Sequence, residues 1–403
     1  MAKFGHSEIK KWYPSELNFH PEVQKLMTLQ DKVTIFDSTL REGEETPGLV
    51  MTIKDKVQIA QRLAELGVEN VEIGYPGYIA DHAETVRALR ERCLPLKLGA
   101  LIRIWSPTFK QEIDECIRLG VDIIEICGGA SDHQLKIRNM SRGHFMDRML
   151  EATEFAKKSG KIVDFYPYDS VRTDLNFMKC IIRYGVEAGA DQIHISDTLG
   201  NTIPIATRYF VQELKKIVSV PIQYHCHNDF GTAVANTCAA VEGGAKIIDL
   251  VINGLGDRAG NANFQETVMA LTCLYGVDTG IRLEKLYEVC KFVEKITKFQ
   301  MEDNKPIVGK FCFVHESDIH VQALLSGHWS AFEPFLPEVV GQKRTNYFGS
   351  TTSRESITLK AQNMGIQLTG DGVEMIMIKI KKEIENKGYA LEEEVAEFIK
   401  NAT

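Results

Sequence analysis

The sequence has little of several features that would place it in a common class of protein. Its 47 basic side chains are fewer than its 55 acidic ones, which argues against a nucleic-acid-binding surface, because such a surface needs a basic face. No apolar run reaches the length of a membrane span. The first eight residues contain no apolar signal-peptide core. We therefore expect neither nucleic acid nor a membrane among the partners of this protein.

Cysteine pairs with metal-binding or redox spacing are also missing. The nine cysteines are scattered and none forms a C-x-x-C pair, and most lie in apolar runs, as Cys127 and Cys180 do. Buried, reduced thiols of this kind are typical of a cytoplasmic protein. No base accompanies any of them in the sequence, so a cysteine nucleophile is not favoured.

What the sequence does have is a regular alternation of strand-like and helical segments. Eight short apolar runs predict strands, at 33–36, 71–73, 98–101, 123–127, 162–166, 192–196, 222–225 and 247–252. Amphipathic segments between them predict helices, as at 54–66, 111–119, 142–159 and 209–218. Eight such units over about 250 residues match an α/β fold of the (β/α)8 TIM-barrel type. The alternative is an open doubly wound sheet, but no G-x-G-x-x-G follows the first run to support its dinucleotide-binding form.

The strand–helix rhythm stops after the eighth unit and so divides the chain. We predict an N-terminal arm at 1–29, a TIM-barrel catalytic domain at 30–285 and an accessory region at 286–403. The accessory region contains helical patterns near 353–364 and 372–387, so we expect it to be mainly helical.

Two histidines at the end of the seventh strand form the most informative local pattern. His225 and His227 are spaced by two along a β-like run, so their side chains point to the same face. Two imidazoles with a carboxylate are typical of a divalent-metal site, and Glu42, beside Arg41 after the first strand, supplies that carboxylate. A metal ion and an arginine in one pocket favour chemistry on a small, oxygen-rich anion. We expect a third strand histidine, His194, to be structural.

Other candidate residues also follow predicted strands. Thr198 follows the sixth strand and Asn261 follows the eighth. In a barrel the carboxyl ends of the strands share one face, where active sites lie, so these distant residues are expected to converge. Simpler interpretations stay open for single residues. Arg41 and Glu42 could form an ion pair at a helix entry, and Asn261 could cap the following helix.

Four motifs, taken in order, resemble a known family. They are DSTLREGE at 37–44, DTLG at 197–200, HCHND at 225–229 and NGLGDRAGN at 253–261. The chain is similar to the Claisen-condensing branch of the DRE-TIM metallolyase superfamily, which includes 2-isopropylmalate, homocitrate and citramalate synthases. The resemblance covers nearly all of the chain from about residue 30 onward.

The resemblance implies a metal-dependent acyltransferase. Such enzymes deprotonate an acyl-CoA, usually acetyl-CoA, at its α-carbon, add the enolate to the ketone of a 2-oxo acid and release CoA by hydrolysis. A divalent ion, which can be Mg²⁺, Mn²⁺, Zn²⁺ or Co²⁺, chelates the 2-oxo acid. By resemblance, the metal ligands are Glu42, His225, His227 and Asn261.

The same resemblance implies roles for further residues. Arg41 would stabilise the developing alkoxide and Thr198 would hold the substrate carboxylate. His133 lies in a stretch that matches the vicinity of the pocket. His320 matches the accessory-region histidine that completes the acid–base machinery. A homodimer is implied, in which the accessory region of one subunit covers the barrel mouth of the other and supplies His320 in trans.

Several positions depart from the family pattern. Tyr168 stands where the catalytic glutamate is expected, and a neutral phenol is a poor base. Asp164 stands where homocitrate synthases carry an arginine that reads a distal carboxylate, which argues against 2-oxoglutarate. Glu45 replaces a substrate-contacting glutamine, Phe332 replaces a tyrosine, and 349–353 reads GSTTS where relatives read GKHSG. Tyr168 is therefore a catalytic candidate and Glu45 and Asp164 are substrate-binding candidates for an unusual 2-oxo acid or acyl partner.

Two other functions stay open at this level. A metal-dependent lyase or aldolase of the same superfamily would cleave a C–C bond, although the string GDRAGNA at 256–262 favours a synthase. A catalytically inactive regulatory relative would explain Tyr168 and Phe332, although a complete metal core speaks against it.

Overall fold

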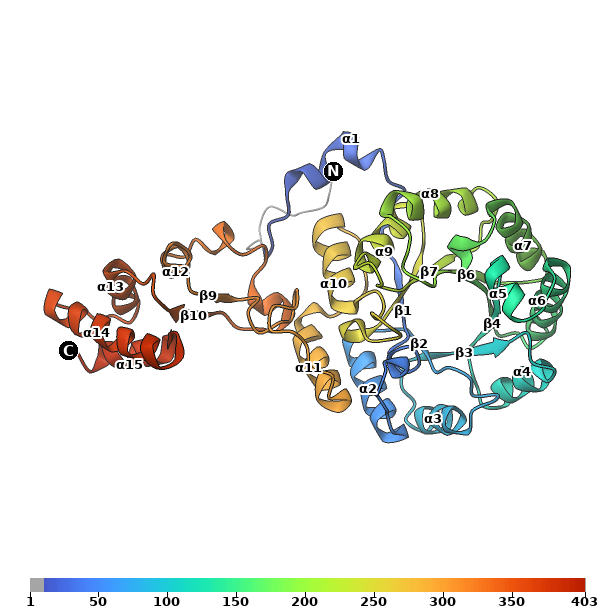
Figure 1. Cartoon of the computed structure of the whole chain (residues 1–403), viewed down its shortest axis with the longest axis horizontal. Helices are drawn as coiled ribbons and strands as arrows, with labels where there is room; N and C mark the ends of the chain where they lie inside the picture. The colour runs from blue at the N-terminus through green and yellow to red at the C-terminus, as the bar shows by residue number, and fades with distance from the viewer. Residues whose placement is uncertain (1–10, 403) are drawn as a thin grey trace.

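The structure, a computed structural model, describes residues 11–402 and shows a closed barrel with a separate lobe (Figure 1). Eight parallel strands follow one another around the barrel, and β8 pairs with β1 to close it. The predicted TIM barrel is therefore confirmed, and the open-sheet alternative is wrong. The strands are β1 (Thr34–Asp37), β2 (Asn70–Glu72), β3 (Lys97–Arg103), β4 (Ile123–Gly129), β5 (Ile162–Tyr168), β6 (Gln192–Asp197), β7 (Ile222–Cys226) and β8 (Ile247–Leu250).

Helices alternate with the strands and cover the outside of the barrel. They are α2 (Ile53–Leu66), α3 (Ala80–Glu91), α4 (Phe109–Arg118), α5 (Asp132–Ile137), α6 (Arg142–Lys157), α7 (Leu175–Glu187), α8 (Pro204–Lys215), α9 (Ala233–Glu242), α10 (Phe264–Met269) and α11 (Leu286–Thr297). In α2, Thr52 and Asp55 form a reciprocal capping box at the start, and Gly67, with a φ of 102°, ends the helix. Val57 and Leu63 lie on its buried face, which packs on the strands.

The barrel interior is layered because every second residue of a strand points inward. Phe36, Ile123 and Ile247, with Ile162 beside them, form an apolar floor. The layer above it is polar and almost fully buried, and consists of Glu72, Glu125, Asp164, His194, His225 and Asp249. Gly99 leaves space for both layers, since an added Cβ would lie 2.7 Å from the Phe36 ring and 2.6 Å from Glu125 Oε1.

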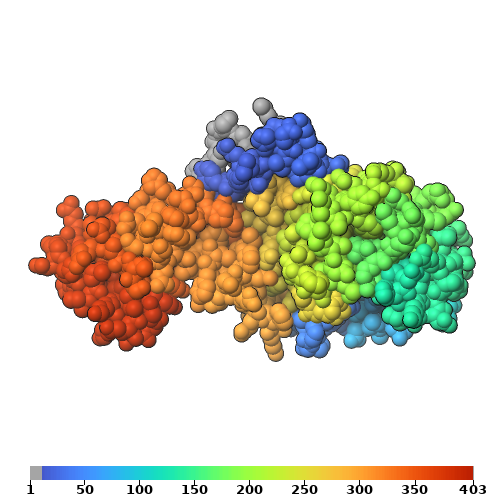
Figure 2. All heavy atoms as spheres, turned by 45° about the horizontal axis from the view of Figure 1, so that its top comes forward, coloured from blue at the N-terminus to red at the C-terminus, as the bar shows by residue number. Residues whose placement is uncertain are grey.

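The accessory lobe has a hydrophobic core of its own, formed by side chains such as Phe348, Ile376 and Val395. Its helices are α12 (Asp318–Leu325), α13 (Arg354–Asn363), α14 (Gly370–Lys387) and α15 (Glu392–Lys400), and its strands are β9 (Val314–His315), β10 (Thr345–Phe348) and β11 (Ala390–Leu391). The three strands form a small sheet, which the sequence did not predict. Figure 2 shows this lobe, in red, projecting from the side of the barrel.

The described part of the N-terminal arm, which includes α1 (Pro21–Gln24), connects the loop between α12 and β10 to the barrel. The carbonyl of Lys11 accepts a hydrogen bond from the amide of Leu336 at 2.9 Å, and the amide of Thr28 donates to the carbonyl of Glu242 at 2.7 Å. Residues 1–10 of the predicted arm lie outside the described residues.

Helix α11 lies on the barrel against α2. Its side chains Leu286 and Val289 belong to the barrel core, and Arg62 of α2 forms an ion pair with Glu288 at 3.0 Å. Among residues 11–402, no helix is both long and apolar enough to cross a membrane.

Candidate metal centre

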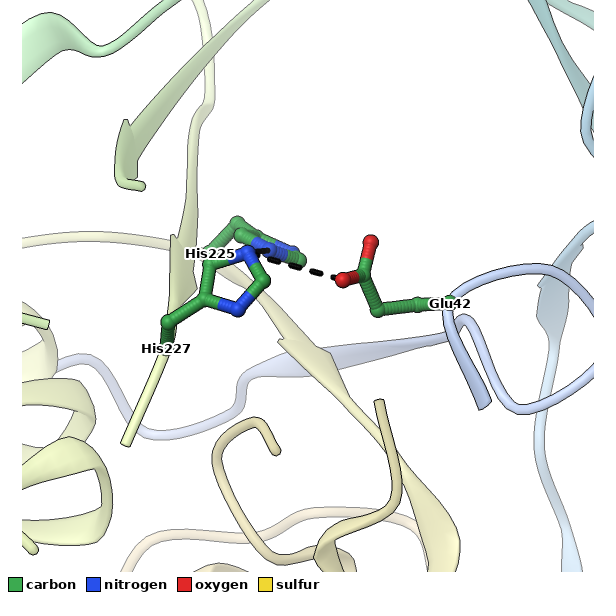
Figure 3. Close-up of side chains that lie close together, drawn as sticks. All are labelled: Glu42, His225 and His227. Atoms are coloured by element: carbon green, nitrogen blue, oxygen red, sulfur yellow. Dashed lines mark hydrogen bonds and ion pairs between the residues drawn. The ribbon is translucent and has the colours of Figure 1, made fainter. Parts of the chain in front are cut away.

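Three side chains from distant parts of the chain meet at the carboxyl end of the barrel. His225 lies on β7 and His227 just beyond it, while Glu42 precedes a short turn after β1. The Nε2 atoms of the two histidines are 3.2 Å apart, and His227 Nε2 lies 3.5 Å from Glu42 Oε1 (Figure 3). All three residues are buried. The structure thus brings together three of the four predicted ligands in one cluster.

The donor atoms of this cluster fit a divalent metal ion. His225 Nδ1 lies 2.9 Å from Asp249 Oδ2, so the ring donates from Nδ1 and keeps the lone pair of Nε2 for a cation. Glu42 Oε1 is buried without a well-formed hydrogen bond. Two imidazole nitrogens and a carboxylate oxygen that face one another at these distances are best satisfied by a positive ion that accepts their lone pairs.

Burial and the surrounding charges give Glu42 and His227 the protonation states that metal ligands need. Burial alone would raise the pKa of Glu42, but the charges of Arg41, His225 and His227 outweigh burial and lower the pKa to about 2. Burial and the neighbouring His225 lower the pKa of His227 to about 3. An ionised carboxylate beside a neutral imidazole is ready to bind a cation without first losing a proton.

Asn261, the fourth predicted ligand, lies against the cluster on the loop that follows β8. Its backbone pairs with that of His227, and its side chain helps to lower the pKa of Glu42. The Oδ1 atom of Asn261 is buried without a hydrogen-bond partner. Gly256 permits this close approach, because it has a φ of 133° and an added Cβ would lie 2.0 Å from Asn261 Nδ2.

Arg41 lies beside the cluster and joins it to the inner wall of the barrel. Its guanidinium forms ion pairs with Glu42 and, at 2.8 Å, with Glu72. The carboxylate of Glu45 lies 3.6 Å away and is partly exposed. Burial alone would lower the pKa of Arg41, but these carboxylates hold it well above its usual value. Arg41 is therefore a fixed cation next to the candidate metal ligands.

Tyr168 and Thr198 lie at the carboxyl ends of β5 and β6. The Tyr168 hydroxyl accepts a hydrogen bond from Arg138 at 3.2 Å and donates one to Gln134 Oε1 at 3.4 Å. Burial raises the pKa of Tyr168, so the phenol is neutral. Thr198 Oγ1 accepts a hydrogen bond from the backbone amide of Asp169 at 3.0 Å, which fixes the hydroxyl near the barrel mouth.

Three predicted site residues lie outside the Glu42–His225–His227 cluster. Asp164 is fully buried deeper on the inner wall of β5, and burial raises its pKa well above its usual value. His133 is exposed on α5. His320 lies on α12 of the accessory lobe, where its ring stacks on Phe332 with centroids 3.9 Å apart. Figure 1 shows this helix well away from the barrel mouth of its own chain.

Sequence reasoning did not identify Asp249, the buried polar residue that hydrogen-bonds to the candidate metal ligand His225. Asp249 accepts hydrogen bonds from His225 Nδ1 and, at 2.6 Å, from Ser38 Oγ. An aspartate between Ile248 and Leu250 in an apolar strand was the available signal, because alternation turns such a residue inward. His194, which we expected to be structural, lies 3.2 Å from a carboxylate oxygen of Asp164 in the same layer.

Comparisons with known proteins match both parts of the chain. The family described as HMGL-like matches residues 32–293, and the one described as homocitrate synthase post-HMGL domain-like matches residues 307–388. Among solved structures, the HMG-CoA lyase from Brucella melitensis has a TM-score of 0.59 at 19% identity, over 67% of this chain and 100% of the lyase chain. At this identity the likeness shows the barrel fold alone.

Curated relatives are more similar in sequence. The 2-isopropylmalate synthase of Methanocaldococcus jannaschii is 40% identical over 346 residues, which are 86% of this chain and 66% of that protein. The homocitrate synthase AksA of Methanothermobacter thermautotrophicus is 36% identical over 97% of this chain and 98% of its own length. The (R)-citramalate synthase CimA of M. jannaschii is 36% identical over 87% of this chain and 70% of its own length.

Proposed function

The chain belongs to the HMGL-like family, in the Claisen-condensing branch of the DRE-TIM metallolyases, and on this premise we propose that it is a metal-dependent acyltransferase. It joins the α-carbon of an acyl-CoA, in the first instance acetyl-CoA, to the keto carbon of a 2-oxo acid. The α-carbon loses a proton, the keto oxygen gains one, and water cleaves the thioester to give free CoA and a new carboxylate. The product is a 2-hydroxy dicarboxylate of the alkylmalate type.

The observation that carries this proposal is the buried cluster of Glu42, His225 and His227 beside Arg41. It lies at the carboxyl end of the barrel strands, which is where TIM-barrel enzymes place their active sites. A divalent ion held there by these ligands and Asn261 would act as Lewis acid and template for the 2-oxo acid.

The other residues at the mouth bind the substrate and stabilise charge. Arg41 presents a fixed guanidinium to the oxygen on which negative charge develops. Thr198, whose Oγ1 already accepts the amide hydrogen of Asp169, donates its hydroxyl hydrogen to the substrate carboxylate. Glu45 at the rim and His133 on α5 border the route by which the larger substrate enters.

The proton of the acyl-CoA needs a base that Tyr168 cannot supply, since its phenol is neutral. His320 is an imidazole in a lobe that projects from the barrel, near His315 at 3.4 Å. We assign the acid–base step to His320 of a second subunit, whose lobe covers this barrel mouth in a homodimer.

The first experiment measures CoA-thiol release from acetyl-CoA across a panel of 2-oxo acids. We expect release with at least one of them in the presence of Mn²⁺ or Mg²⁺, and loss of release with EDTA or in the His227→Gln variant. His82→Gln serves as a matched control, because this buried histidine hydrogen-bonds to the Tyr75 amide and lies outside the candidate ligand set. Absence of release with every 2-oxo acid, by protein that has bound its metal, would contradict the proposal.

A mixing experiment tests the assignment of His320. Glu42→Gln and His320→Ala proteins are each expected to be inactive. After subunit exchange, half of the dimers are mixed, and each mixed dimer has one site with both residues intact. About a quarter of the parent activity should therefore return if His320 acts in trans. Full inactivity of the mixture, with exchange verified by mass, would overturn this assignment.

A further inference from the structure

Three buried polar side chains face one another on the inner wall formed by β4, β5 and β6. Glu125 and Asp164 are register partners on β4 and β5, and His194 lies on β6. His194 Nδ1 is 3.2 Å from Asp164 Oδ2 and 3.7 Å from Glu125 Oε2. None of the three is more than 1% exposed. We call these residues the inner acid triad.

The inner acid triad lacks well-formed hydrogen bonds. Within residues 11–402, the oxygens of Glu125 and Asp164 and Nδ1 of His194 have no hydrogen bond of good geometry, although contact with Gln192 partly offsets the rise in the pKa of Asp164 that burial causes. The other carboxylates of the same layer have charged or hydrogen-bonding partners: Glu72 forms an ion pair with Arg41 at 2.8 Å, and Asp249 accepts hydrogen bonds from His225 and Ser38. A buried carboxylate without a partner costs several kcal/mol, and burial accordingly raises the pKa of both carboxyls; a cation from outside the chain would stabilise their ionised forms.

The walls of the triad suit an organic cation. The ring of Tyr166 stacks on His194 with centroids 3.6 Å apart and planes 6° apart, so an aromatic side chain packs directly against the triad. Aromatic faces and carboxylates together are the groups that bind ammonium and guanidinium ions in proteins. Gly99 keeps the space of the Glu125 carboxylate free, because an added Cβ there would lie 2.6 Å from Oε1.

The triad lies within reach of a substrate held by the candidate metal ligands. The ring centroids of His194 and His225 are 6.2 Å apart, and Asp249 stands between them, 2.9 Å from His225 Nδ1 and 3.8 Å from His194 Nε2. A 2-oxo acid whose carboxylate and keto oxygens were bound by a metal ion at His225 would need a side chain of only a few carbons to reach Asp164.

We propose that the inner acid triad is a substrate subsite for a cationic group at the distal end of the 2-oxo acid, such as a guanidinium or an ammonium. This inference rests on the proposed function and names the substrate class for the same site. A divalent metal ion is the other source of positive charge that these donor types accept. The organic cation is favoured because its N–H groups can donate hydrogen bonds to both Glu125 and Asp164, whereas a metal ion would also need water in a space closed to solvent.

The test compares three 2-oxo acids: 5-guanidino-2-oxopentanoate, 2-oxohexanoate, whose side chain is uncharged, and 2-oxoglutarate. We expect kcat/KM to favour the guanidino acid by roughly 10–100-fold, which is the value of charge-assisted hydrogen bonds. Asp164→Asn and Glu125→Gln should each bring this preference toward unity, and Asp164→Arg should shift it toward 2-oxoglutarate. Glu112→Gln is the control, because this buried carboxylate pairs with Arg103 outside the triad and its loss should leave the preference unchanged.

The outcomes separate this inference from the function on which it rests. Release of CoA with 2-oxohexanoate and none with the guanidino acid would overturn the inference but would still support the proposed synthase function. Absence of release with any acid would overturn the synthase itself. A metal content of about two ions per chain that falls to one in Asp164→Asn would show that the triad holds a metal and would also overturn the inference. If Asp164→Asn does not fold by circular dichroism, Glu125→Gln decides the question.

Discussion

The two sides of the barrel mouth treat buried charge in opposite ways. On the metal side, which carries Glu42, His225 and His227, the fixed cation Arg41 helps to hold the pKa of Glu42 at about 2. On the acid side, which is the inner acid triad, burial and neighbouring carboxylates raise the pKa of Glu125 well above its usual value. The metal side favours the ionised carboxylate of Glu42, whereas the acid side favours protonated carboxyls that lack well-formed hydrogen bonds among the described residues.

This difference separates the reaction from the choice of substrate. The metal side contains the motif residues that carry the resemblance to the condensing enzymes, so we propose that it determines the kind of chemistry. The acid side contains Asp164, which departs from the family pattern, so we propose that it determines which substrate is selected. Variants on the two sides should therefore fail in different ways.

The largest effect is expected on the metal side from Arg41→Gln. Loss of a fixed cation next to developing oxyanion charge should lower kcat by roughly 10²–10³-fold while the metal stays bound. Arg41→Lys keeps the charge but loses the two-pronged contact with Glu42 and Glu72, so it should recover only part of the rate. Steady-state CoA release with metal analysis checks this. An Arg41→Gln protein with normal kcat would show that the two sides do not divide the work as proposed.

The next effect concerns the group beneath the metal ligands. Asp249→Asn removes the carboxylate that orients His225 through Nδ1, so metal affinity should fall by roughly 10–100-fold. Titration of the EDTA-treated protein with Mn²⁺ or Zn²⁺ measures this change. Asp37→Asn is the matched control, because Asp37 is equally buried and accepts hydrogen bonds from Thr39 instead. Equal affinities in Asp249→Asn and the parent would remove Asp249 from the metal site.

The two sides should also respond to pH with opposite signs in the metal-free protein. The pKa of His227 is lowered to about 3, so its contribution to stability is present above the unfolded value of 6.5 and is lost as pH falls toward 3. The pKa of Asp164 is raised by burial, so its contribution is present below 3.8 and is lost as pH rises.

Chemical unfolding of single variants at two pH values measures these opposite pH dependences of stability. Relative to the parent, the His227→Gln variant should gain on the order of 1–2 kcal/mol in free energy of unfolding at pH 5 and little at pH 8. The Asp164→Asn variant should gain more free energy of unfolding at pH 8 than at pH 5. The reason is that the unfolded parent ionises this acid as pH rises, whereas burial keeps it protonated in the folded parent. Variants that change stability equally at both pH values would show that neither group titrates as described.

The parts of this arrangement that sequence could predict are those set by local pattern. The eight strands were predicted nearly in place because each is a short apolar run between helices. The common face of His225 and His227 followed from the two-residue period of a strand. The convergence of Glu42 with them followed from the rule that barrel strands end on one face.

The rest depends on how neighbouring strands are aligned. Pairing of Glu125 with Asp164 requires the β4–β5 register, and the approach of His194 requires its β6 neighbour, neither of which a single sequence states. The small sheet of the accessory lobe was missed because β9 and β11 are two residues long. The place of His320 in an active site depends on a second subunit, so it stays a prediction.

The smallest effect is expected at Tyr168, the boundary between the two sides. Tyr168→Phe removes hydrogen bonds with Arg138 and Gln134, which should cost about 1 kcal/mol of stability and change kcat by less than roughly 10-fold. A catalytic base at this position would instead lose roughly 10²–10⁴-fold. The pH profile of kcat distinguishes the two cases: a phenolate base would make the rate climb as pH approaches the raised pKa of Tyr168, and Tyr168→Phe would abolish that climb. A neutral Tyr168 leaves the profile unchanged, which would place the base elsewhere and leave His320 as the residue that has to account for it.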